Sequence, residues 1–310
     1  MAETMATRQA YGKTLIELGE KYPQLVVMDA DLSKSTMTAE FGKSYPDRFF
    51  NMGIAEQNLY GAAAGLALSG KIVCASTFAM FATGRAFEII RNSIGYTRAN
   101  VKICATHAGI TVGEDGASHQ TFEDIALMRT IPGMTVINPS DGVSAKKLLE
   151  QAGAMEGPCY VRLGRAKVPV FYEDSDQLTL GRGNLVRDGK DVTIVATGIM
   201  VSEAMAAAEK LKEDGVDARI IDIHTIKPID EEILIKAAQE TGAIVTAEEH
   251  SIIGGLGSAV AEVIVKNCPV KMAMVGQKDT YGESGKPDEL KKKYGMTAED
   301  IEAAVKNLIG

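Results

Sequence analysis

The sequence is poor in aromatic residues, cysteine and histidine. It has no tryptophan, only 5% aromatic residues, and four histidines and four cysteines among 310 residues. No cysteine pair forms a CxxC motif and three cysteines lie in apolar, strand-like segments, which favours reduced core residues of a cytoplasmic protein over a disulfide framework. Nothing at the N-terminus has the order of a signal peptide and no apolar run is long enough to span a bilayer, so we expect neither secretion nor membrane insertion. The cysteines are Cys74, Cys104, Cys159 and Cys268.

Positive charge is also scarce. The chain has 33 Lys and Arg against 41 Asp and Glu, for a net charge of −8. No basic stripe interrupts this balance, which argues against a nucleic-acid-binding surface. The composition, 45% hydrophobic and 24% charged, is that of a globular protein, and the length suffices for two domains.

Apolar runs alternate with helical patterns over the first half of the chain. Such an alternation predicts βαβ units around a buried parallel sheet. The apolar runs are 24–28, 71–75, 101–105 and 135–137, and the clearest helical patterns are 56–68 and 85–94.

A second α/β pattern follows a less periodic stretch with prolines and charges. We therefore predict an α/β fold of two domains, residues 1–170 and 191–310, joined by a linker at 171–190. The second domain is expected to contain strands near 191–198, 218–222 and 243–247, and helices at 202–213, 231–240 and 298–308.

Half of the histidines lie on one glycine-rich segment, 106–120, which follows the apolar run 101–105. Loops at the carboxyl ends of strands are where open α/β sheets bind ligands. The segment carries imidazoles, carboxylates and a hydroxyl, which indicates a loop that handles a polyol or a carbonyl compound. His107 and His119 have no cysteine or third histidine at ligand spacing, so uncharged imidazoles that bind hydroxyls or phosphate fit better than metal ligands.

Two further patterns suit acid–base or ring-binding chemistry. Glu56 begins an Ala- and Gly-rich helical pattern, where the helix dipole alone accounts for an acidic residue. Its apolar neighbours, however, predict a buried carboxyl group that holds a proton and donates it to a ring nitrogen. Phe78 and Phe81 share a helix face by spacing, which is typical of core packing, but they also follow a strand directly, where a flat heteroaromatic ring could stack on them.

In combination and in this order, these motifs resemble the pyrimidine-binding half of transketolase, a thiamine-diphosphate enzyme. The resemblance covers nearly the whole chain: a pyrimidine-binding domain to about residue 170, then a transketolase C-terminal domain. Its motifs are Asp31-Leu32 with Ser35, Gly53 to Asn58, Ser76-Thr77-Phe78 with Phe81, and the loop His107 to Gln120.

The resemblance implies a site for thiamine diphosphate. Glu56 matches the glutamate that hydrogen-bonds N1′ of the aminopyrimidine and thereby promotes removal of the thiazolium C2 proton. Phe78 and Phe81 match the aromatic pocket around the pyrimidine, and Asp31 and Leu32 match residues near the cofactor.

The resemblance also implies a sugar-phosphate channel. His119 matches the histidine near the C1 hydroxyl and carbonyl of the donor, and Asp115 matches the carboxylate that binds the C2 hydroxyl. Together with Glu56, the two loop histidines are the implied catalytic residues. The residues implied to hold the sugar phosphate, for which Arg and His are suited by charge and geometry, are Arg8, Ser35, His107 and Arg165.

The sequence departs from whole transketolases in two ways. Gly84 stands where many carry a tyrosine at the pocket edge, and the metal–diphosphate motif, GDG followed by a downstream Asn, is absent; Gly113-Glu114-Asp115-Gly116 is not that motif. The chain begins where the diphosphate-binding domain would end, so it resembles the C-terminal (B) subunit of a split transketolase. We expect an N-terminal (A) subunit to carry GDG and the Asn and to hold Mg²⁺ or Ca²⁺, with no metal ligands on this chain. The cofactor would lie between the two chains, and the pyrimidine domain would self-associate.

Three alternatives differ from a heteromeric transketolase that transfers a two-carbon ketol unit between sugar phosphates. Deoxyxylulose-phosphate synthases share the Gly-Ile-Ala-Glu-Gln run but generally lack a histidine matching His107. The β subunits of 2-oxo acid dehydrogenases lack the paired-histidine loop. A non-catalytic regulatory paralogue would have no need to retain Glu56, His107, Asp115 and His119 together. Xylulose 5-phosphate with ribose 5-phosphate or erythrose 4-phosphate is the family's usual substrate pair in the pentose phosphate pathway, and a branch specialised for another ketose phosphate would have the same motifs.

Overall fold

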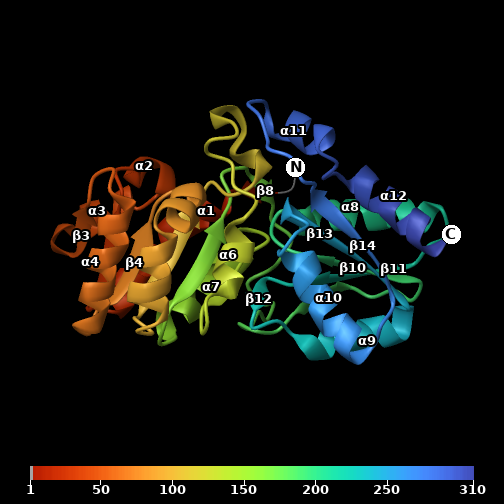
Figure 1. The fold of residues 1–310 in the computed structure, drawn as a ribbon, viewed down its shortest axis with the longest axis horizontal. Helices are drawn as coiled ribbons and strands as arrows, with labels where there is room; N and C mark the ends of the chain where they lie inside the picture. The colour runs from red at the N-terminus through yellow and green to blue at the C-terminus, as the bar shows by residue number, and fades with distance from the viewer. Residues whose placement is uncertain (1–2) are drawn as a thin grey trace.

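The computed structural model describes residues 3–310 as two α/β lobes that lie side by side, each built around its own sheet (Figure 1). The first sheet has seven strands in the order β12-β6-β7-β5-β4-β2-β3. All its pairings are parallel except that of β12 with β6. Its strands are β2 (Leu25–Asp29), β3 (Phe49–Asn51), β4 (Ile72–Ser76), β5 (Val101–Thr106), β6 (Thr135–Ile137), β7 (Cys159–Leu163) and β12 (Thr225–Lys227).

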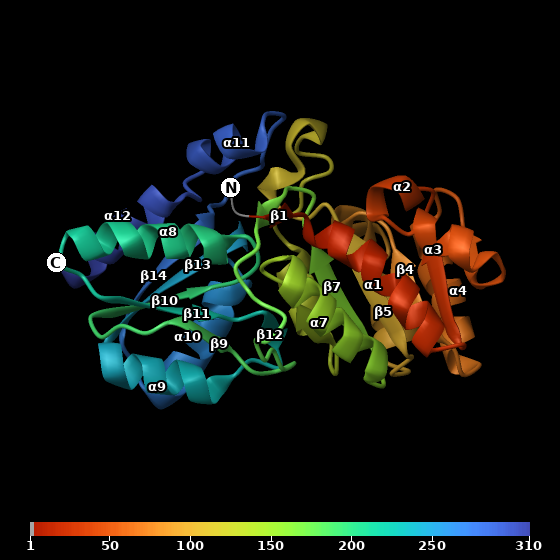
Figure 2. The same ribbon diagram turned by 180° about the vertical axis from the view of Figure 1, so that it is seen from behind.

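Helices cover both faces of the first sheet. This explains why every residue of β2, β4, β5 and β7 is buried and why these strands are continuous apolar runs rather than alternating ones. On one face α1 (Thr7–Lys21) packs beside α7 (Gly142–Ala154), as Figure 2 shows. On the other face lies α4 (Glu56–Leu68).

The helical pattern expected at 85–94 is present but is wound more widely than an α-helix. Around α5 (Phe87–Ile89), the turns η2 (Phe81–Arg85) and η3 (Ile90–Gly95) have i→i+5 hydrogen bonds, such as the 3.3 Å bond from the Ala86 N–H to the Phe81 carbonyl. Such π turns occur often at functional sites.

The second sheet has five strands in the order β14-β13-β10-β11-β9. Helices α8 (Met200–Glu213) and α12 (Ala298–Ile309) cover one face, and α9 (Glu231–Thr241) and α10 (Leu256–Asn267) cover the other (Figure 1). Its strands are β9 (Asn184–Arg187), β10 (Val192–Ala196), β11 (Ala218–Asp222), β13 (Ala243–Ser251) and β14 (Lys271–Gln277). The predicted fold class, two α/β domains with mostly parallel sheets, is confirmed.

Two short strands have positions that the apolar pattern did not predict, and one of them joins the lobes. Strand β9 lies within the stretch 171–190 that we expected to be a linker, and it pairs antiparallel with β11. Strand β12 comes from the second half of the chain but joins the first sheet, at the edge of β6. A further pair, β1 (Thr4–Met5) and β8 (Val168–Pro169), is antiparallel.

The remaining short elements are α2 (Ser33–Thr36), α3 (Ala39–Ser44), η1 (Pro46–Arg48), η4 (Ile110–Asp115), α6 (Asp124–Thr130) and α11 (Pro287–Lys293). All four cysteines are free, and Cys74, Cys104 and Cys159 are buried. No helix in residues 3–310 is both long enough and apolar enough to cross a membrane.

Candidate active site

An aromatic cluster lies at the carboxyl ends of β4 and β5. The rings of Phe78 and Phe81 are close to parallel, with centroids 6.2 Å apart and an interplanar angle of 16°. The His107 ring stacks on Phe78 at 3.9 Å, and the His119 ring meets Phe81 edge-on at 5.3 Å. A parallel β-bridge between Phe78 and Thr106 brings the two loops together. The structure therefore joins both predicted phenylalanines and both predicted histidines in one cluster.

His107 occupies a constrained position. Its φ of 58° is in the left-handed region, and its Nδ1 lies 2.8 Å from the Thr106 hydroxyl. Burial, with smaller contributions from the nearby charges of Arg8 and Arg165, lowers the pKa of His107 to about 3. The imidazole is therefore neutral at physiological pH and has one donor and one acceptor nitrogen.

Glu56 is buried at the first turn of α4 and forms an ion pair that sequence reasoning missed. Its Oε2 accepts a 2.9 Å bond from Nη1 of the half-exposed Arg85, and the Arg85 guanidinium also lies 4.8 Å from the centre of the Phe81 ring. The four-residue spacing from Phe81 to Arg85 on a helical pattern was the available signal. Arg85 links the buried carboxylate to the aromatic cluster.

Asp31 and Leu32 lie on the loop after β2. Asp31 has a left-handed φ of 63°, and its backbone N–H donates to the Asn51 side chain at 3.0 Å. The Leu32 N–H donates at 2.6 Å to the carboxylate of Asp29, which also accepts bonds from two threonine hydroxyls. Burial raises the pKa of Asp29. Asp29, which sequence reasoning did not select, thus fixes the loop that carries the two predicted residues.

Two guanidinium groups lie close to His107. Nη1 of Arg8 donates to the Ser35 carbonyl at 2.7 Å, and Nη1 of Arg165 donates to Glu114 at 2.7 Å. Partial burial, and then the charge of Arg165, lower the pKa of Arg8. The buried Nε of Arg8 has no hydrogen-bond partner within residues 3–310. Two cations and an unsatisfied donor beside a neutral imidazole are suited to binding an anion.

Asp115 is the predicted site residue with the fewest contacts to the others. It is exposed at the end of η4, and no hydrogen bond in the described part of the chain joins it to them. Residues 3–310 contain no group of three or more His, Cys, Asp or Glu side chains arranged to hold a metal ion.

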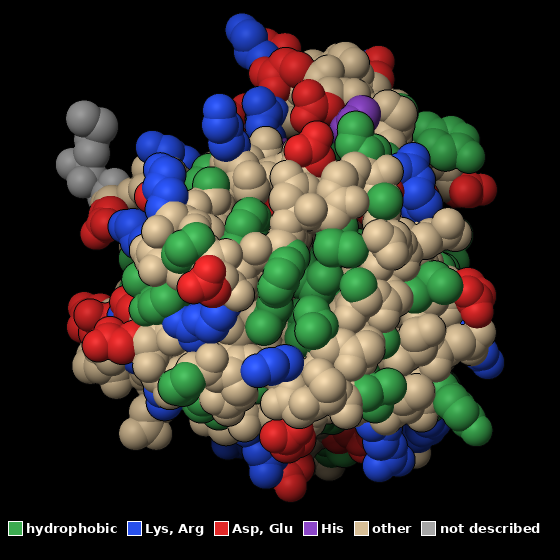
Figure 3. All heavy atoms as spheres, turned by 90° about the vertical axis from the view of Figure 1, so that its left-hand side faces the viewer, with side chains coloured by type: hydrophobic (Ala, Val, Ile, Leu, Met, Phe, Trp, Pro, Cys, Tyr) green, Lys and Arg blue, Asp and Glu red, His purple; other side chains and the backbone are tan. Residues whose placement is uncertain are grey.

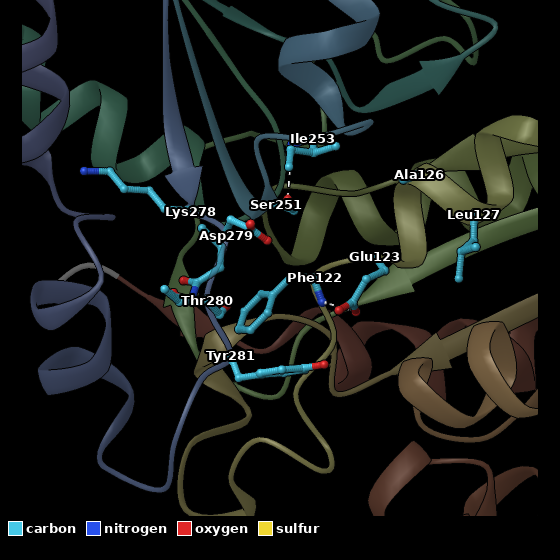
Figure 4. Close-up of a pocket in the computed structure, with 11 residues that line it drawn as sticks. Phe122, Glu123, Ala126, Leu127, Ser251, Ile253, Lys278, Asp279, Thr280 and Tyr281 are labelled. Carbon is cyan, nitrogen blue, oxygen red and sulfur yellow. Dashed lines mark hydrogen bonds between the residues drawn. The ribbon is translucent and has the colours of Figure 1, made fainter.

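A separate hollow of about 380 Å³ lies between α6 and the ends of β13 and β14 (Figure 4). The rings of Phe122 and Tyr281 lie on one side of it in this view, with Lys278 and Asp279 nearby. None of the predicted site residues lines this hollow.

Family models match most of the chain. The transketolase pyrimidine-binding domain matches residues 3–170, and the transketolase C-terminal domain matches residues 181–301. The putative transketolase C-terminal section of Methanocaldococcus jannaschii is 56% identical over 297 residues, which are 95% of this chain and 93% of that protein. The 6-deoxy-6-sulfo-D-fructose transketolase subunit SqwH of Clostridium sp. (strain MSTE9) is 44% identical, over 95% of this chain and 91% of that protein.

A solved structure agrees. A split gene transketolase, described as an inactive beta4 tetramer, superposes with a TM-score of 0.91 at 54% identity and covers 99% of both chains. By contrast, this chain spans 50% of the length of the transketolases of Homo sapiens and Mus musculus. These matches confirm the resemblance drawn from the sequence motifs.

Proposed function

We propose that this chain, which belongs to the transketolase family, supplies the pyrimidine-binding half of the active site of a two-subunit transketolase. The complete enzyme would transfer a two-carbon ketol unit from a ketose phosphate to an aldose phosphate. The observation that carries the proposal is the cluster of Phe78, Phe81 and two histidines beside the buried carboxylate of Glu56.

The chain's residues fit the aminopyrimidine ring of thiamine diphosphate, which when bound supplies the carbanion-stabilising chemistry of ketol transfer. The rings of Phe78 and Phe81 would line an apolar wall against a planar heterocycle and exclude water from it. Glu56, with its side chain only 3% exposed, would exchange a proton with a ring nitrogen. The Thr77 hydroxyl next to Phe78 is buried and has no hydrogen-bond partner among the described residues. A polar atom of a bound ligand would supply that missing partner.

The loop histidines and the guanidinium groups would bind the sugar phosphate. Arg8 and Arg165 would neutralise the phosphate, because each presents N–H donors in a fixed planar arrangement. His107, being neutral, would add a hydrogen bond without charge. His119 and the exposed Asp115 lie further along the same loop and would meet the hydroxyl groups at the reacting end of the sugar.

A partner chain would complete the active site. We propose that an N-terminal subunit carrying GDG and a downstream Asn holds the diphosphate together with Mg²⁺ or Ca²⁺. The chain's relatives support this arrangement, since two of them are described as a C-terminal section and a subunit, and the similar split gene transketolase tetramer is described as inactive.

Self-association would use the outer face of α4. No exposed charged residue lies between Ile54 and Leu68, which are 79% and 63% exposed. Gly61 and Gly65 face open space, so a second helix can approach closely there. Figure 3 shows hydrophobic side chains gathered on this side of the molecule. We propose that copies of the pyrimidine domain pair through this face.

Reconstitution tests the proposal. The purified chain should have no ketol-transfer activity, and addition of the N-terminal partner, thiamine diphosphate and Mg²⁺ should restore it. Glu56→Gln should abolish the restored activity while leaving the fold intact, whereas Glu40→Gln, which removes an exposed surface carboxylate, should have no effect. Activity of the chain alone would contradict the need for a partner, and full activity of Glu56→Gln would favour a non-catalytic role.

Two anionic ketoses are candidate donors. The relative SqwH is named for 6-deoxy-6-sulfo-D-fructose, whose sulfonate is an anion that the same pair of arginines could bind. Xylulose 5-phosphate and this sulfosugar should therefore be assayed side by side. We expect the phosphate ester to have the higher kcat/KM, and the opposite ranking would assign the chain to a sulfosugar transketolase.

A further inference from the structure

The crevice at which the second sheet would be expected to bind a ligand is filled by the first lobe. In this sheet β10 lies between β11 and β13, which makes the carboxyl ends of β10 and β13 the topological switch point. There the Arg162 Nη2 donates to the Glu249 carbonyl at 2.8 Å, and the Thr197 hydroxyl donates to the Asn138 carbonyl at 3.4 Å. The position that holds ligands in related sheets is used here for contact between lobes.

Glu249, at this crevice, binds the backbone of the loop that carries His107 and His119. Its Oε1 accepts a 2.7 Å hydrogen bond from the Thr111 N–H, and the side chain is buried. Gly109, with a φ of 80°, lies so close that a Cβ there would be 2.3 Å from the carboxylate carbon. Arg162, itself anchored by a 2.7 Å bond to the buried Asp124, lies 3.8 Å from the other carboxylate oxygen. The loop therefore packs directly against the Glu249 carboxylate, and Arg162 holds that carboxylate in place from the other side.

The rest of the loop also lies against the second lobe. The Gln120 amide donates at 2.9 Å to the carbonyl of Glu283, and a Cβ on Gly116 would be 2.5 Å from the Ser284 hydroxyl. Helix α11, which belongs to the second lobe, packs beside η4 (Figure 1). Both ends of the segment are thus supported by residues distant in sequence.

We propose that Glu249 is a positioning residue: by binding the Thr111 amide, it holds the loop 107–120 in the conformation that presents His107 and His119 to the substrate. The role of the loop toward sugar rests on the function proposed above, but the effect of Glu249 on the loop does not. The C-terminal domain then acts as a support for the substrate side of the active site.

Three variants isolate the contact. Glu249→Ala removes the acceptor and leaves the buried Thr111 N–H unsatisfied, whereas Glu249→Gln keeps an oxygen for it. Glu248→Ala is the matched control, because Glu248 is equally buried on the same strand but binds the N–H groups of Leu256 and Gly257 at the start of α10. Gly109→Ala disturbs the same contact from the loop side and serves if Glu249→Ala does not fold.

Hydrogen exchange of the isolated chain is the first readout. Glu249→Ala should raise the exchange rate of amides in 107–120 at least tenfold, which corresponds to about 1.4 kcal/mol, and Glu249→Gln should raise it less than threefold. Glu248→Ala should accelerate exchange near 252–260 and leave the loop unchanged. An unchanged loop in Glu249→Ala, or equal loosening in Glu248→Ala, would overturn the proposal.

Kinetics of the reconstituted complex are the second readout. Glu249→Ala should raise KM for the ketose phosphate at least tenfold, with kcat changed less than threefold and the affinity for thiamine diphosphate unchanged, and Glu249→Gln should restore most of the loss. A fall in cofactor affinity alone would contradict a role at the sugar. If the wild-type complex has no ketol-transfer activity, the proposed function fails, while hydrogen exchange still decides whether Glu249 holds the loop.

Discussion

His107 should stay uncharged far below the pH at which an ordinary histidine takes up a proton. Its ring is buried against Phe78, and Arg8 and Arg165 lie near it, so that its pKa falls to about 3. At pH 6 about 0.1% of such side chains would be protonated, compared with about 76% for an unperturbed imidazole. His107 itself would therefore present the same donor and acceptor nitrogens to a sugar phosphate across the working range.

The same shift has a consequence for stability. Because the folded pKa is depressed, the unfolded chain binds a proton at this site below about pH 6.5 while the folded chain does not. The stability contributed by neutral His107 is thus complete above pH 6.5 and falls by about 1.4 kcal/mol per pH unit below it. Between pH 8 and pH 5 the loss is about 2 kcal/mol.

NMR and urea unfolding test both statements. His107→Asn is the suitable variant, because asparagine tolerates the left-handed φ of 58° and does not titrate. In the wild type, the imidazole signal that this variant removes should show no inflection between pH 4 and 8. Unfolding followed by circular dichroism, since the chain lacks tryptophan, should show the extra loss of about 2 kcal/mol only in the wild type. An inflection near pH 6.5, or equal pH slopes in the two proteins, would contradict the lowered pKa of His107.

Three other substitutions have defined outcomes. Arg85→Ala removes the half-exposed ion pair with Glu56, which is worth up to about 1 kcal/mol. It should therefore tighten binding of thiamine diphosphate to the reconstituted complex by up to about fivefold, as measured by calorimetry. Weaker binding would instead make Arg85 part of the cofactor site. Burial raises the pKa of Asp222 to about 7, so the stability that protonated Asp222 contributes is complete below about pH 4 and is lost as the pH rises through 7. In urea unfolding, Asp222→Asn should flatten that decline by up to about 1.4 kcal/mol per pH unit. An unchanged slope would contradict the raised pKa of Asp222. Arg162→Met leaves the buried Asp124 without its cation and should lower the free energy of unfolding by about 3–5 kcal/mol, and a loss below 1 kcal/mol would be inconsistent with a buried charge there.

The sequence predicts the central strands of the fold, and which of the candidate site residues lie together, for a physical reason. Strands such as β4 and β5 are buried on both faces, so their residues form continuous apolar runs that stand out without any structural information. Because these strands are neighbours and parallel, their carboxyl ends meet, and the residues that follow them must lie together. The cluster of Phe78 and His107 follows from that arrangement.

Other features depend on contacts between distant residues. Strand β9 is short and only partly buried, and β12 is completed by pairing with a strand from the other half of the chain, so neither has a distinctive local pattern. The ion pair of Glu56 with Arg85 and the bond from Thr111 to Glu249 join residues 29 and 138 positions apart. Charged residues at such separations look like ordinary surface residues in the sequence.

The position of β12 has a further consequence for how the chain unfolds and how it can be divided. Because this strand covers the edge of β6, a fragment that ends before it would expose unpaired backbone groups at that edge of the sheet, which is a known route to aggregation. The lobes also share a buried ionic contact through Arg162 and Glu249. We expect the two lobes to lose structure in a single cooperative transition rather than one after the other. An enzyme of this family can be divided between two chains, but the two lobes of this chain should not fold as separate fragments.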